Sequence, residues 1–153
     1  MTGIESDKLH PFEKMENAVI AALAPLEGEG VKEISPYVGQ YNVDKLEDLL
    51  PRFPSVFVAA GELVVPDSPN AGRVRLGVTL LVGDQNRRSM KDSIRGDSRS
   101  PGVYHMLARC QDLLHGKVLI PGWRSFRVAS EQALVYLPKE RICIFNAFYT
   151  TEF

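Results

Sequence analysis

The chain has 153 residues and a mass of 17.0 kDa, the size of one ordinary domain. Hydrophobic residues make up 44% of it and charged residues 24%, which excludes a disordered tail, a collagen-like fibre and a disulfide scaffold. The net charge is −1, yet residues 1–50 hold 4 Lys or Arg and 10 Asp or Glu, whereas residues 51–153 hold 14 and 9.

The two parts of the chain therefore carry net charges of −6 and +5. Such an asymmetry fits either charge complementarity within one molecule or identical copies that meet head to tail. No run approaches 18 apolar residues and the polar start lacks the pattern of a secretory signal, so we expect neither a membrane span nor export. Two cysteines are too few for a disulfide framework, which favours a reducing, cytoplasmic environment.

Residues 1–11 are expected to be a flexible N-terminal extension of a single domain, 1–153. Apolar residues at every third or fourth position predict an amphipathic helix over residues 12–26. Residues 31–38 follow as a short extended segment, in which Pro36 favours a sheet edge. A second helix of about two turns is predicted with Asn42 as its cap and with an apolar stripe of Val43, Leu46, Leu49 and Leu50.

Two β-hairpins are predicted from the remaining apolar patterns. Residues 55–65 and 73–82 form the first, with one solvated face, around the turn formers of residues 66–72. Residues 124–137 and 141–150 form the second, around residues 138–140.

Between the hairpins the sequence predicts a long basic loop, residues 83–102, and then a helix. Ser100 and Pro101 are expected to start this helix as its N-cap and first residue. Val103, Leu107, Cys110 and Leu114 form its apolar face, and His115-Gly116 ends it. The predicted fold is α+β: a mainly antiparallel sheet of four to five strands, including both hairpins, with two to three helices on one face.

The motifs of nucleophile elbows, phosphate loops and dinucleotide sites are all missing from the sequence. His105 and His115 stand ten residues apart on one predicted helix, too far to share a metal ion. The histidines are therefore interpreted as solvated or capping residues, and Cys110 and Cys143 as core residues. Glu27, Glu29 and Glu33 are interpreted as a solvated acidic face. We predict no catalytic site, no cofactor and no metal.

The predicted loop carries the strongest functional signal. A flexible, exposed stretch with five cations can bind a phosphate, a carboxylate or another subunit, although it can also be a solvated loop without a ligand. Aromatic residues are not interleaved with these cations, so a protein partner fits the loop better than nucleic acid, and no sequence-specific nucleic-acid binding is expected. The candidate interface residues are Arg87, Arg88, Lys91, Arg95 and Arg99.

Five stretches of the sequence carry a resemblance to a known family. They are Tyr37-Val38-Gly39, residues 46–58 (LEDLLPRFPSVFV), 80–88 (LLVGDQNRR), 102–116 (GVYHMLARCQDLLHG) and 145–151 (FNAFYTT). With the order of predicted elements, they make nearly the whole chain resemble a small virion protein of Mu-like phages and prophages. We associate this family with the tail terminator, or tail completion, proteins of long-tailed phages.

The resemblance implies a structural protein without an enzymatic site. Such proteins are α+β subunits that assemble as a hexameric ring on the last ring of the tail tube and stop tube polymerisation. The ring presents a surface to head-completion or neck proteins and, in contractile tails, also holds the end of the sheath. The implied location is the tail or neck of a virion that is assembled in the cytoplasm of a bacterial host, with no membrane partner.

Two other classes of function stay open at this point. One is a head–tail connector or another neck protein of similar size. The other is a small anion-binding domain or enzyme whose Arg-rich loop closes over its ligand. The missing acid–base pair argues against the enzyme.

Overall fold

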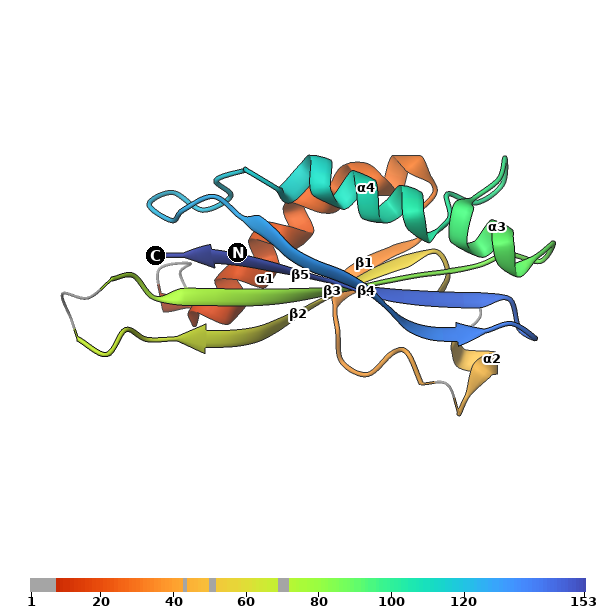
Figure 1. The fold of residues 1–153 in the computed structure, drawn as a ribbon, viewed down its shortest axis with the longest axis horizontal. Coiled ribbons are helices and arrows are strands. Elements are labelled where there is room, and N and C mark those ends of the chain that lie inside the picture. The colour runs from red at the N-terminus through yellow and green to blue at the C-terminus, as the bar shows by residue number, and fades with distance from the viewer. Residues whose placement is uncertain (1–7, 43, 50–51, 69–71) are drawn as a thin grey trace.

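The computed structural model describes residues 8–42, 44–49, 52–68 and 72–153. Within them, five strands form one sheet in the order β1-β2-β3-β5-β4 (Figure 1). The pair of β1 and β2 is parallel and the other pairs are antiparallel, which confirms the predicted α+β class and mainly antiparallel sheet. The strands are β1 (Glu33–Pro36), β2 (Ser55–Val64), β3 (Arg75–Gln85), β4 (Arg127–Leu137) and β5 (Ile142–Glu152).

Two long helices, α1 (Pro11–Leu23) and α4 (Val103–Leu114), lie side by side over one face of the sheet (Figure 1). The short helix α3 (Met90–Arg95) contacts α4 and the strands β3 and β5. The single turn α2 (Leu46–Leu49) lies on the other side of the sheet from α4. Helices on one face were predicted, and both hairpins were predicted at nearly their observed positions.

The sequence of α1 explains which side of the helix is buried and where the helix ends. Its residues Met15, Val19 and Leu23 are four positions apart and fully buried. Proline at position 25 cannot donate a backbone hydrogen bond, and there the chain continues as a 3₁₀ helix, η2 (Ala24–Glu29). The predicted helix of residues 12–26 is therefore α-helical only as far as Leu23.

Two expectations for the first half of the chain need correction. The second helix has one turn and does not begin at Asn42, whose Oδ1 instead accepts a hydrogen bond from the amide of Asp44 at 3.0 Å. Val43 and Leu50 of its expected stripe lie outside the described residues. The face of the first hairpin that was expected to be solvated is covered where β2 begins. There Tyr41 and Phe53 stack with ring centroids 5.6 Å apart, on the side of the sheet opposite the helices. Tyr41 also forms a hydrogen bond with Ser55.

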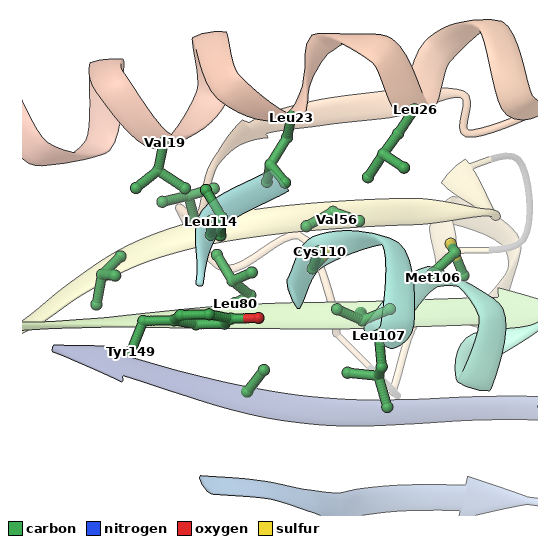
Figure 2. Close-up of a cluster of buried hydrophobic side chains, with 14 of the residues drawn as sticks. Val19, Leu23, Leu26, Val56, Leu80, Met106, Leu107, Cys110, Leu114 and Tyr149 are labelled. Carbon is green, nitrogen blue, oxygen red and sulfur yellow. The ribbon is translucent and has the colours of Figure 1, made fainter. Parts of the chain in front are cut away.

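The main core lies between the helices and the sheet. Figure 2 shows side chains of α1 and α4 meeting those of β2, β3 and β5, with Tyr149 lying beneath α4. These apolar contacts remove large side chains from water, which is the dominant stabilising term for such a fold. The labelled members of this core are Val19, Leu23, Leu26, Val56, Leu80, Met106, Leu107, Cys110, Leu114 and Tyr149.

Both cysteines are free and buried, as predicted for core residues. Burial raises the pKa of each thiol to about 12, so the reactive thiolate is rare at pH 8. We expect a thiol reagent such as Ellman's reagent to leave Cys110 and Cys143 unmodified in the native protein and to titrate both after denaturation. Rapid modification of either native thiol would contradict this assignment.

Candidate subunit interface between β3 and α4

The predicted loop of residues 83–102 is shorter and more ordered than expected. Strand β3 continues through Gln85, and α3 occupies residues 90–95. Ser89 starts α3 as its N-cap, because its Oγ accepts a hydrogen bond from the amide of Asp92 at 3.0 Å. We call the remaining stretch, residues 86–102, the basic segment.

A buried carboxylate ties the end of the basic segment to the sheet. Asp84, on β3, is fully buried, and its Oδ2 accepts hydrogen bonds from Ser100 Oγ at 2.5 Å and from the amide of Gly102 at 2.9 Å. Its Oδ1 accepts from the amide of Gln85 at 2.7 Å. Burial raises the pKa of Asp84 although these hydrogen bonds act in the opposite direction.

These contacts correct the predicted start of the last helix. Ser100 does not cap it, since its hydroxyl donates to Asp84, and Gly102 occupies the N-cap position. The helix therefore begins at Val103. Its predicted apolar face and its end at His115 are confirmed.

A second carboxylate shapes the turn that holds Arg99. Asp97 Oδ1 accepts hydrogen bonds from the amides of Arg99 at 2.9 Å and Ser100 at 3.0 Å, and its Oδ2 accepts from Asn86 Nδ2 at 3.0 Å. The hydrogen bond from Asn86 is the largest cause that lowers the pKa of Asp97. The backbone around Arg99 is thus fixed from within the chain.

All five predicted interface cations are exposed, and four of them line two clefts. A cleft of about 570 Å³ is lined by Arg87, Arg88 and Arg99, together with Lys32. A cleft of about 460 Å³ on the other side of the turn is lined by Arg95 and again by Arg99. Lys91 lines neither of these clefts.

Lys32 is a site residue that the sequence analysis missed. It lies 55 positions before Arg87 and directly precedes β1. The parallel pairing of β1 with β2 brings it beside the end of β3. No local spacing in the sequence signals this long-range contact.

Part of the charge asymmetry is neutralised within the molecule. Arg109 Nε and Nη2 donate to the two carboxylate oxygens of Glu29 at 2.9 and 3.0 Å, and Arg52 Nη1 donates to Glu33 at 3.1 Å. Glu29 and Glu33 are therefore ion-paired, which corrects their interpretation as a purely solvated face. The hydrogen bond from Arg109 lowers the pKa of Glu29.

Replacing Glu29 with glutamine is expected to lower the Tm slightly at pH 7 and by less at pH 3. A lowered carboxylate pKa means that the pair stabilises the fold above the ordinary pKa and loses this effect as the pH falls through the lowered value. The effect is small because both side chains are about one-third exposed, at 29% for Arg109 and 31% for Glu29. Thermal unfolding of the wild type and of Glu29→Gln at pH 3 and pH 7 measures this difference in Tm. An equal difference at the two pH values would show that the ion pair with Arg109 does not cause it.

The histidines have structural partners. His10 Nδ1 accepts from the amide of Phe12 at the start of α1, and His115 Nδ1 accepts from the amide of Val128. His105 Nε2 lies 3.6 Å from Glu29 Oε1. Among the described residues, no three His, Cys, Asp or Glu side chains are grouped so that they could hold a metal ion. No helix in the described part of the chain is long and apolar enough to cross a membrane.

A second exposed surface lies along the edge strand β4. Tyr104 of α4 and Tyr136 of β4 both meet Phe145 edge-on, with ring centroids 5.8 and 6.0 Å apart. Both tyrosines are about half exposed, as is Leu134. An unpaired strand edge with aromatic neighbours is a surface of the kind that proteins cover by assembly.

The comparisons with known proteins identify the family and a structure with a similar fold. No curated protein matches the chain. One solved structure, described as "Virion of native gene transfer agent (GTA) particle", contains a chain with the same fold. It has 14% sequence identity and a TM-score of 0.55, and the match covers 90% of this chain and 92% of that one. The model of the family described as "Bacteriophage Mu, Gp37" matches residues 11–142, so the chain belongs to that family of Mu-like phages.

Proposed function

We propose that this protein is a structural component of a phage virion and, within it, the tail terminator. Its copies form a ring, hexameric in our proposal, that caps the tail tube and stops tube polymerisation. The ring then offers its free side to a head-completion or neck protein, and its rim to the end of the sheath in a contractile tail. The protein acts through these interfaces and not through bond chemistry.

The observation that carries the proposal is the set of unused cations on the basic segment. The side chains of Arg87, Lys91, Arg95 and Arg99 have no hydrogen bond or ion pair among the described residues. Exposed arginines without partners, on a backbone fixed by Asp84 and Asp97, are suited to carboxylates on another protein. Membership of a Mu phage family and the fold shared with a chain of a gene transfer agent particle support a virion as the setting.

A tube-length assay tests the proposal directly. The tail-tube protein of the same phage is allowed to polymerise with and without this protein, and tube lengths are measured by electron microscopy. We expect added protein to give shorter tubes with a ring at one end. Binding to a head-completion protein without any effect on tube length would instead identify a connector.

Removing three cations by the substitutions Arg87→Ala, Arg88→Ala and Arg95→Ala is expected to abolish ring formation and capping. Folding should be unaffected, because exposed substitutions usually change stability by less than about 0.5 kcal/mol each. The matched control removes three exposed arginines at the other end of the sheet, Arg73, Arg124 and Arg127. If the control fails equally, the loss reflects net charge and not the basic segment.

A further inference from the structure

The cleft lined by Lys32, Arg87, Arg88 and Arg99, which we call the cationic cleft, has the features of a built anion site. Its volume is about 570 Å³, and none of the described residues that line it carries a carboxylate. The four cations come from three separate stretches of the chain, namely the start of β1, the end of β3 and the turn before α4. Their convergence is therefore a product of the tertiary fold.

Three of the four cations of the cleft have no ionic partner among the described residues. The side chains of Lys32, Arg87 and Arg99 make no hydrogen bond or ion pair among the described residues. Arg88 is partly balanced by the charge of Asp97, a residue that does not line the cleft. The cleft is thus cationic and preorganised, so an anion can bind without rearranging its backbone.

The same chain carries an exposed acidic turn of matching charge. Asp44, Glu47 and Asp48 are all exposed at α2, and their carboxylates have no partner among the described residues. Glu29 and Glu33, by contrast, are already paired with Arg109 and Arg52. Residues 44–48 therefore hold three unpaired carboxylates and one lysine, Lys45, which gives this stretch a net charge of −2. We call these five residues the acidic turn.

The acidic turn does not reach the cleft of its own molecule. No ion pair joins the two within the described residues, and Figure 1 shows α2 on the side of the sheet away from α3 and α4. We therefore consider a contact in which the turn of one copy meets the cleft of another. Such a heterologous contact repeats from copy to copy and generates a closed ring or an open filament.

We propose that the cationic cleft of one copy binds the acidic turn of a second copy. This inference rests on the proposed function, because it names the repeating contact of the ring. Carboxylates fit the site better than a nucleic acid does, since the one aromatic side chain that lines the cleft, Phe53, is only 3% exposed and cannot stack on a base. In this proposal, the charges of the cleft and of the acidic turn that have no partner within one molecule act between subunits.

Charge reversal on each side, followed by mixing, tests this contact. The cleft variant is Lys32→Glu with Arg87→Glu and Arg99→Glu, which leaves a net charge of −2 on the four cleft positions. The turn variant is Glu47→Lys with Asp48→Lys. Each variant alone presents like charges at the contact, so its self-association should weaken by at least about tenfold. A 1:1 mixture restores opposite charges at every contact, and we expect it to regain the wild-type mass in light scattering. Arg73→Glu with Arg124→Glu and Arg127→Glu is the control at the opposite end of the sheet.

The outcomes given first overturn the inference and leave the proposed function open to its own test, whereas the last one contradicts only the proposed function. Wild-type mass in either single variant, or no recovery on mixing, would place the subunit contact elsewhere. A wild-type protein that stays monomeric at low salt would exclude self-association through this cleft, even if it still shortens tubes. Loss of duplex DNA binding in the cleft variant, with self-association intact, would assign the cleft to nucleic acid. Restored assembly without tube capping would instead contradict the terminator function alone.

Discussion

Replacing Gly102 with alanine is expected to lower the free energy of unfolding by about 3 kcal/mol. Gly102 has a φ of 78°, and a Cβ added there would lie 2.1 Å from the amide nitrogen of Gly96 and 2.5 Å from the carbonyl carbon of Arg95. Both atoms belong to the backbone, so they cannot move aside like the end of a side chain. The substitution must separate α3 from the start of α4.

Gly116 provides a matched control for this prediction. Its φ is 77°, nearly equal to that of Gly102, but no heavy atom would lie within 4 Å of an added Cβ. Gly116→Ala therefore adds only the backbone strain, about 1–2 kcal/mol. Urea unfolding of both variants measures the difference between them. Equal losses would show that the close approach of the two backbones costs nothing.

The sequence was sufficient for the parts of the fold that depend on local patterns. The period of four in α1 predicted a helix because it indicates one buried face. The turn residues predicted the hairpins because they mark the connection between two neighbouring strands. Helix α3 was missed although Ser89 and Asp92 form a start signal and Met90 and Ile94 are four positions apart. Six residues are too few for a periodic pattern to stand out.

The candidate site was predicted only in part, because its remaining features depend on contacts between distant residues. The basic residues were visible as a cluster in the sequence. The role of Ser100 was misassigned, since a serine before a proline is typical of a helix start and nothing local reveals the buried carboxylate of Asp84, 16 positions away. Lys32 joins the cleft through the parallel pair of β1 and β2, and such long-range pairing has no signature in spacing.

Replacing Asp84 with alanine is expected to cost about 3 kcal/mol of stability, because it removes the acceptor of three hydrogen bonds. The amide of Gly102 is buried and would be left without a partner, whereas Ser100 and Gln85 are partly accessible to water. Hydrogen exchange at the Gly102 amide should become faster. Asp84→Asn is the control, since it keeps the volume and one acceptor oxygen and should lose less. An alanine variant as stable as the wild type would contradict the anchoring role.

The pH dependence of the stability difference between the wild type and Asp84→Asn tests whether the Asp84 carboxyl group causes that difference. Burial raises the pKa of Asp84, so its contribution to stability is complete below the ordinary aspartate pKa and declines as the pH rises through the raised value. The advantage of the wild type over Asp84→Asn should therefore be largest near pH 3 and smaller at pH 7.

Asp84 is fully buried and can touch no other copy, yet it fixes the turn that carries Arg99. We therefore expect Asp84→Ala to self-associate more weakly than the wild type under conditions where it stays folded, and Gly116→Ala to self-associate normally. This result would mean that the subunit contact requires the cleft in its preorganised shape.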